Sequence, residues 1–309
     1  MCRINTLGLK YFFEGIGVGL PGPCRQPVEG ELADHKSRVE SGISLDFEGR
    51  MSYGDYLKLD TLLSAQKPLS DKQDETLFII LHHVQELWLR LIIHELEFAM
   101  RNLREDKAGI AFKALARVSA IQEQLVTAWD VLSTMTPSDY MTFRDQLGQA
   151  SGFQSYQYRL VEILLGAKDE RMLAPHRHRP EIHARLREAF DGPSIYDEAI
   201  ALVARAGFDV PKDLLERDFS KTHQHNEALQ EIWLTVYREP ERHFELYELA
   251  EELVDVEDRF QQWRFRHMKT VERIIGHKKG TGGSSGVGFL KTALDRTFFP
   301  ELWAVRTDL

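Results

Sequence analysis

The sequence predicts an all-α fold, and two observations carry this prediction. Apolar residues recur at helical spacing along most of the 309-residue chain. Alternating segments typical of half-buried strands are almost absent, which excludes a Rossmann fold. No period of roughly 20 to 50 residues repeats, so a solenoid receives no support.

Prolines, glycines and capping residues mark where the helices are expected to begin and end. Long helices are expected from Ser70 to about 104 and from about 108 to 134. The longest is expected from Pro240, which suits a first helical turn, to Ile275. Shorter helices are expected after Thr136, between Gly152 and Gly166, and, after a turn that ends on the cap Ser194, from about 195 to 206.

The helices are expected to form one domain, residues 45–309, because no linker rich in Pro, Gly or Ser divides them. Residues 1–44 differ in character and lack the long apolar centre of a signal peptide, so we expect a poorly ordered extension. The apolar segment 77–100 includes Glu86, Arg90 and Glu95. These charges argue against a membrane span and favour a core helix.

Charge and cysteine content narrow the class of protein. There are 39 Lys and Arg against 48 Asp and Glu, a formal net charge of -9, and the basic residues are dispersed. This argues against a nucleic-acid partner. Cys2 and Cys24 are the only cysteines and show no CxxC spacing. They are too few for a disulfide framework, so we expect a reducing, cytoplasmic location.

The twelve histidines do not form a usual metal motif. Neither HExxH nor Glu-x-x-His occurs, so the sequence lacks the usual signatures of zinc hydrolases and of di-iron helical bundles. The pair His223 and His225 has a ligand-compatible spacing but no obvious third partner. His176, His178 and His183 lie among charged residues, and we expect them on a solvated surface.

His267 lies on an apolar face of the expected final helix, in line with Phe260, Trp263, Val271 and Ile274. Arg264, Arg266, Lys269 and Glu272 fall mainly on other faces. A lone histidine in this setting is usually a core residue with satisfied nitrogens. It is also what a haem iron needs, since one axial ligand suffices and the macrocycle prefers apolar walls. Composition permits haem without showing it.

A glycine loop follows this helix, with glycines at 280, 282, 283, 286 and 288 and Thr281 among them. It matches no phosphate-binding pattern, because no P-loop lysine or GxGxxG is present and no strand precedes it. Two interpretations stay open on composition alone. The loop either lines an anionic or zwitterionic ligand or is a solvated connection.

Two further pairs of residues carry weaker signals. Arg144, one turn after Tyr140, could clamp a carboxylate together with that phenol, although a surface pair with Asp145 is the commoner meaning. His82 shares a helix face with Phe78. Taken with its helix alone, His82 is better explained as a core or interface histidine.

Four segments together resemble the bacterial type of the tryptophan 2,3-dioxygenase family, and the likeness runs from about residue 45 to the C-terminus. They are YGDYLKLDTLLSAQ at 53–66, ETLFIILHHVQELWL at 75–89, TPSDYMTFRDQLGQASGFQSYQYR at 136–159 and WRFRHMKTVERIIGHKKGTGGSSGVGFL at 263–290. The resemblance implies an all-α homotetramer with one haem b per subunit, held in a pocket between long helices. It also implies cleavage of the indole C2–C3 bond of L-tryptophan by O2, giving N-formyl-L-kynurenine.

The resemblance also implies roles for individual residues. His267 corresponds to the proximal haem ligand, with Trp263 and Gly282 beside the cofactor; its second nitrogen would need a partner to orient it. His82 corresponds to the distal histidine that accepts the indole N–H. The remaining substrate contacts are Phe78, Tyr140, Arg144 and Thr281, with Tyr53, Tyr56 and Leu57 reaching into a neighbouring subunit's site.

The chain departs from the family pattern in two places. Leu81, His83 and Val84 stand where more polar neighbours of the distal histidine are expected, which leaves ambiguity about His83. The first forty residues match nothing in the family. Three alternatives stay open beside this function: a dioxygenase with broader indoleamine specificity, a haem- or tryptophan-binding sensor without turnover, and a purely structural helical protein.

Overall fold

The computed structural model of the protein describes residues 42–309, and these residues form helices joined by turns, with no strand. The all-α prediction is therefore confirmed for the described chain. Two compact units are present, one ending at Leu59 and the other running from Asp60 to Leu309. The expected extension, residues 1–44, lies almost wholly outside the described residues, so its boundary stays a prediction.

The described part of the first unit contains the short helix α1 (Tyr53–Leu57). Ser52 caps it: its hydroxyl accepts from the backbone N–H of Asp55, and the Asp55 carboxylate accepts from the backbone N–H of Ser52. This reciprocal pair satisfies two N–H groups that a helix start leaves free. The side chains of Tyr53, Tyr56 and Leu57 are exposed in the single chain.

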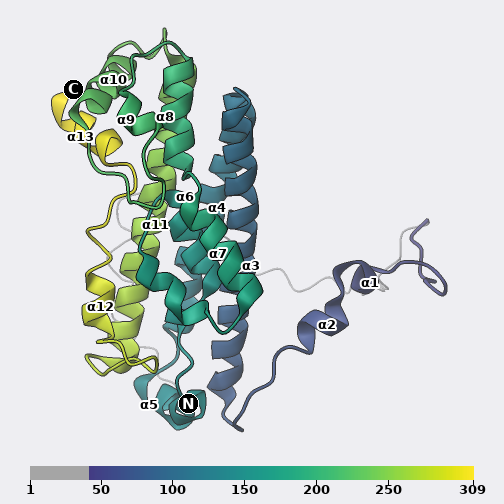
Figure 1. Cartoon of the computed structure of the whole chain (residues 1–309). Helices are drawn as coiled ribbons and strands as arrows, with labels where there is room; N and C mark the ends of the chain where they lie inside the picture. Colours follow the sequence, from purple (N-terminus) through teal and green to yellow (C-terminus); the bar gives the residue numbers. More distant parts are fainter. Residues whose placement is uncertain (1–41) are drawn as a thin grey trace, which may run out of the picture. The chain divides into compact units, whose positions relative to one another are not determined.

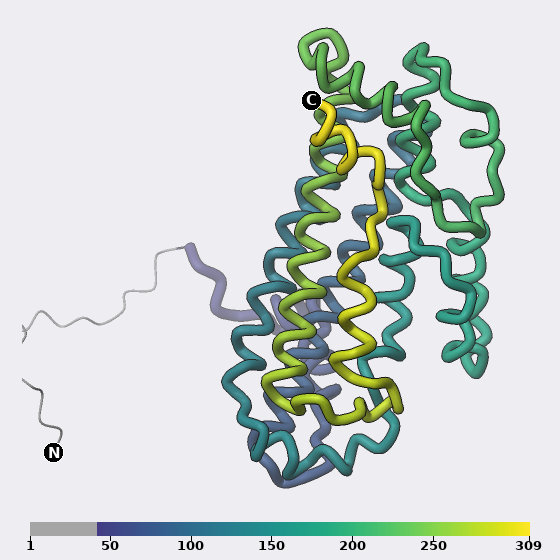
Figure 2. The backbone as a smooth tube through the Cα atoms, turned by 90° about the vertical axis from the view of Figure 1, so that its left-hand side faces the viewer, coloured from purple at the N-terminus to yellow at the C-terminus, as the bar shows by residue number. Residues whose placement is uncertain are grey.

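Three long helices dominate the second unit: α3 (Gln73–Arg104), α4 (Ala108–Leu132) and α11 (Phe244–Ile275). Figures 1 and 2 show them running side by side. Their facing sides are apolar, and Leu96, Val118 and Leu253 are fully buried between them. Burying such a side chain contributes roughly 1.5–3 kcal/mol, so packing along these stripes holds the bundle together.

A short helix, α2 (Leu59–Leu63), precedes the bundle in the chain. Other short helices close the ends and flanks of the bundle (Figure 1). They are α5 (Pro137–Phe143), α6 (Tyr156–Leu165), α7 (Pro180–Asp191), α8 (Ile195–Arg205), α9 (Lys212–Leu215), α10 (Glu227–Arg238), α12 (Val287–Lys291) and α13 (Pro300–Asp308). Short 3-10 turns cover Arg144–Leu147, Gly152–Gln154 and Glu170–His176.

The predicted helix starts agree with the structure where a capping side chain defines them. Thr136 caps α5 through a reciprocal pair with Asp139, and Pro137 occupies the first turn. Ser194 caps α8 in the same way with Asp197. Each cap places a side-chain oxygen where unpaired backbone N–H groups need an acceptor, so the sequence alone locates these starts.

Two sequence expectations are wrong. The final long helix begins at Phe244, not at Pro240, because α10 ends at Arg238 and the backbone N–H of His243 bonds to the carbonyl of Glu239 in the intervening turn. His176 is buried and not solvated, since the 3-10 turn that carries it packs on α7. The acidic and basic residues around His176 in the sequence had suggested a solvated surface.

By length and composition, α3 is the one helix among residues 42–309 that could cross a membrane, with a mean hydropathy of 1.4 over its most apolar window. The core helix of a globular protein has the same properties. Here Ile92 and Leu96 are fully buried, and Glu95 pairs with Arg117 of α4 at 2.7 Å. These contacts favour a core helix.

Candidate active site

Most of the predicted site residues line one cavity of about 380 Å³ in the second unit. Helix α3 contributes Phe78 and His82, α5 contributes Tyr140, and α11 contributes Trp263 and His267, while Thr281 comes from the glycine loop. These residues are up to 203 positions apart in the sequence (281 minus 78). The bundle brings them together because the long helices pack side by side.

His267 lies flat against Trp129 of α4, with ring centroids 4.7 Å apart and planes 10° apart. Trp263 lies on α11 one turn earlier, at 5.2 Å. Burial lowers the pKa of His267 to about 4, so the ring is neutral and one nitrogen can bind a metal. The expected hydrogen-bond partner for the other nitrogen is not found among the described residues. Stacking on Trp129 orients the ring instead.

The hydrogen bond of His82 fixes its tautomer. Nδ1 lies 2.7 Å from the carbonyl oxygen of Phe78, which can only accept, so Nδ1 donates. Burial lowers the pKa of His82 and keeps the ring neutral, which leaves Nε2 as an acceptor. His83 instead faces Gln66, whose Nε2 lies 3.0 Å from its Nδ1, and does not line the cavity. This removes the ambiguity between the two histidines.

Tyr140 lies on α5, and Arg144 directly follows the last residue of that helix. Tyr140 is buried in the wall, and burial raises its pKa. Arg144 does not line the cavity: its Nη2 donates to the carbonyl oxygen of Lys279 at 2.7 Å. Among the described residues the guanidinium bonds to this carbonyl and forms no ion pair with Asp145, so the surface-pair interpretation is wrong. Arg144 ties α5 to the glycine loop.

The glycine loop packs against residues 148–154 as a wall of the cavity. The Thr281 hydroxyl donates to the carbonyl oxygen of Ala150 at 2.5 Å. A Cβ added to Gly282 would lie 2.8 Å from the Cβ of Ser151. A Cβ added to Gly286, whose φ is +62°, would lie 2.7 Å from the carbonyl oxygen of Lys278. Glycine is required where backbones approach this closely. The loop is thus not a merely solvated connection, and Gly282 contacts Ser151 instead of lining the cavity.

Sequence reasoning missed part of this site. Trp129 reads as an ordinary core position of α4, and nothing in its spacing marks it as the partner of His267. Arg264 was expected mainly outside the apolar face, yet it is buried and donates to Glu162 of α6 at 3.1 Å. The position of Arg264, a charged residue one turn before His267, was the only signal in the sequence. Its partner Glu162 is identified only by the packing of α6 against α11.

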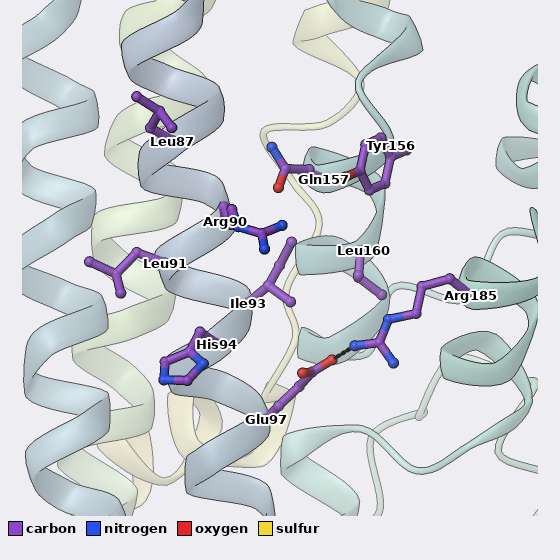
Figure 3. A pocket seen from close by; sticks show the side chains of 10 residues that line it. All are labelled: Leu87, Arg90, Leu91, Ile93, His94, Glu97, Tyr156, Gln157, Leu160 and Arg185. Carbon is purple, nitrogen blue, oxygen red and sulfur yellow. Dashed lines mark hydrogen bonds and ion pairs between the residues drawn. The ribbon is translucent and has the colours of Figure 1, made fainter. Parts of the chain in front are cut away.

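A second, more open groove of about 490 Å³ runs between α3, α6 and α7 (Figure 3). An ion pair between Arg185 and Glu97 crosses it. The groove contains none of the predicted site residues. The cavity beside His267 is therefore the candidate site.

A family model described as tryptophan 2,3-dioxygenase matches residues 38–309. The chain belongs to the tryptophan 2,3-dioxygenase family. Among its relatives of that name, one from Bacillus thuringiensis (strain Al Hakam) is 55% identical over 276 residues, covering 89% of this chain and 99% of the relative. Another, from Polaromonas sp. (strain JS666 / ATCC BAA-500), is 56% identical over 288 residues, covering 93% of this chain and 98% of the relative.

The cavity of this tryptophan 2,3-dioxygenase family member fits a haem. His267 presents a neutral imidazole, and much of the surrounding wall is apolar, including Phe78 and Leu89. The indole N–H groups of Trp129 and Trp263 are buried without a partner in the described chain. Buried donors normally have partners, so these two indicate that a bound group completes the site. No cluster of ligands for a bare metal ion occurs among residues 42–309.

Proposed function

We propose that this protein is a haem-dependent dioxygenase that cleaves the indole C2–C3 bond of L-tryptophan with O2, giving N-formyl-L-kynurenine. The observation that carries the proposal is the meeting of two neutral histidines, His82 and His267, in one largely apolar cavity. Family membership supports the same reaction. His267 would hold one haem b per subunit, with Trp129 and Trp263 beside it, and the bound haem supplies the oxygen chemistry.

The side chains around the cavity would bind and orient the substrate. Nε2 of His82 is an acceptor for the indole N–H, and the Phe78 ring, 4.1 Å from the His82 ring, forms an apolar wall. Arg144 and Thr281 would exchange their present backbone carbonyl partners for the carboxylate and ammonium of tryptophan, with Tyr140 beside them. The glycine loop excludes water, and positioning of the indole is the protein's main contribution.

We also propose a homotetramer in the cytoplasm. Tyr53, Tyr56 and Leu57 expose apolar surface in the single chain and would enter a neighbouring subunit's site. Ile80, Val84 and Leu87 form a second exposed apolar stripe, along one face of α3. Such a stripe is typical of a subunit interface. The cytoplasmic location rests on the scarcity of cysteine.

The test uses full-length protein loaded with haem, reduced, and mixed with L-tryptophan and isotopically labelled O2. We expect mass spectrometry to detect a product whose mass equals that of tryptophan plus two labelled oxygen atoms. The His267→Ala variant is expected to form no such product. Haem-loaded protein that binds tryptophan without forming product would contradict the proposal and favour a sensor. Turnover of D-tryptophan and tryptamine at comparable rates would favour the broader indoleamine specificity.

A further inference from the structure

A buried cluster of three charged residues lies beside the cavity, on α6 and α11. Arg159 and Glu162 of α6 line the cavity, and Arg264 lies behind them. All three side chains are more than nine-tenths buried. The Glu162 carboxylate accepts from Arg159 Nη1 at 2.5 Å and from Arg264 Nη2 at 3.1 Å. Two guanidinium cations share one carboxylate, so these three side chains together carry one net positive charge.

A further buried carboxylate, Glu257 of α11, interacts electrostatically with Arg264, but its oxygens accept from the backbone N–H groups of Phe298 and Phe299. In the described chain Arg159 pairs with no carboxylate other than Glu162, which it shares with Arg264. Tyr158 donates its hydroxyl to Glu162, and burial raises its pKa to about 12, so this phenol stays uncharged. Glu86 also lines the cavity, but it accepts from Gln157 and forms no ion pair among residues 42–309. Buried charges are usually paired because an isolated one is costly to desolvate. Arg159 therefore has no carboxylate to itself.

Arg159 is the cation of the cluster that lines the cavity and can receive an anion from it. Its guanidinium carbon lies 4.9 Å from the centroid of the Phe153 ring and 5.0 Å from that of Tyr158. These two rings hold the guanidinium in place at the cavity wall. The Arg159 guanidinium donates one hydrogen bond in the described chain, from Nη1 to Glu162. Its other N–H groups have no partner among the described residues. Guanidinium groups bind carboxylates through two parallel N–H donors.

We propose that Arg159 binds a propionate carboxylate of the haem, and that this carboxylate is the anion that balances the charge of Arg159. The inference rests on the proposed haem site and deepens it. It assigns the direction of the macrocycle, because the propionate edge then faces α6 and the opposite edge lies away from it. It also explains why a helix in the core of the bundle carries two cations and one carboxylate.

The test compares two probes on the full-length apo-protein: haem and haem dimethyl ester, which lacks both carboxylates. The wild-type protein is expected to bind haem more tightly than the ester. Arg159→Met is expected to weaken haem binding about 10- to 100-fold, the effect of one charge-assisted hydrogen bond, and to leave ester binding within about twofold. The variant keeps the Glu162–Arg264 pair intact, so its fold is expected to persist.

Arg171→Met is the matched control. Arg171 also lines the cavity but is exposed and already paired with Asp169 at 2.8 Å, so its removal should leave haem binding unchanged. Equal affinity of wild type for haem and ester, or equal loss of both probes in Arg159→Met, would overturn the proposal. The comparison of haem with its ester on the wild type needs no variant, so it can overturn the proposal even if Arg159→Met does not fold. Failure of the wild type to bind either probe would instead overturn the proposed haem function.

Discussion

The imidazole of His267 and the indole of Trp129 are stacked, with ring centroids 4.7 Å apart and planes 10° apart. The two residues come from different helices, α11 and α4, and no described hydrogen bond holds the imidazole. The orientation of the proposed haem ligand thus depends on an aromatic contact between helices. This relationship can be tested separately from the rest of the site.

Replacing Trp129 with Leu should loosen the His267 ring and weaken haem binding. Aromatic pairs contribute about 0.5–1.5 kcal/mol beyond their burial, which corresponds to roughly 2- to 12-fold in affinity. Titration of the apo-protein with haem measures the change. Trp129→Phe keeps a ring against the imidazole and should bind more tightly than Trp129→Leu; equal affinities for the two variants would show that stacking is irrelevant.

Arg144→Ala should raise KM for L-tryptophan by roughly 10- to 150-fold, since a hydrogen bond to a charged group contributes about 1.5–3 kcal/mol. The same change removes the bond to the Lys279 carbonyl, so the glycine loop should also become more sensitive to protease. Steady-state kinetics and limited proteolysis check the two effects. Asp145→Asn, at the exposed neighbouring position, is the control. An unchanged KM in Arg144→Ala would refute the carboxylate assignment.

Gly282→Ala should push the glycine loop away from Ser151, because the new Cβ would lie 2.8 Å from the Ser151 Cβ. Overpacking of this kind costs about 1–3 kcal/mol and should raise KM by roughly 5- to 150-fold. The double variant Gly282→Ala with Ser151→Gly removes the clash and should recover part of the loss. A double variant no better than Gly282→Ala would mean that the two residues do not meet.

Glu252 on α11 makes stability depend on pH. Burial, and then the charges of Asp255 and Glu248, raises its pKa from 4.5 to about 7. The folded state therefore binds the proton more firmly than the unfolded state, and stability falls as pH rises from 4.5 to 7. Because Glu252 is only half-buried, Glu252→Gln should add about 1 kcal/mol to the free energy of unfolding at pH 8 and nothing near pH 4.5.

Urea unfolding at the two pH values measures this difference. Glu245→Gln, at an exposed position of the same helix, serves as the control and should show a smaller change between them. A gain of the same size at both pH values would point to a cause other than titration of Glu252.

Val84→Glu should break the proposed subunit contact along α3. Val84, Ile80 and Leu87 expose 38%, 46% and 48% of their side chains at helical spacing, so a charge at the centre of this stripe would be buried on assembly. Sedimentation velocity should then show smaller species than the wild type. Gln124→Glu adds the same charge at an exposed position of α4 and should leave the assembly unchanged. Intact assembly of Val84→Glu would exclude this stripe.

The sequence by itself determined the all-α class, most helix bounds and the placement of His267 on an apolar helix face. These features depend on local rules: helical periodicity, the caps at Thr136 and Ser194, and glycine after a helix end. The start of α11 was expected at Pro240, which suits a first helical turn, but proline suits a turn between helices equally well. The roles of His82, Arg144 and Thr281 came from the family resemblance, since none carries a decisive signal alone.

Only the tertiary structure decided which side chains meet. Trp129 stacks on His267 and Glu162 pairs with Arg264 because α4, α6 and α11 pack together, and no spacing within one helix encodes those contacts. The glycine loop meets Ser151 across 131 residues (282 minus 151), which explains its composition as close backbone approach. Periodicity tells which face of a helix is buried, but the partner on that face is set by packing of the whole chain.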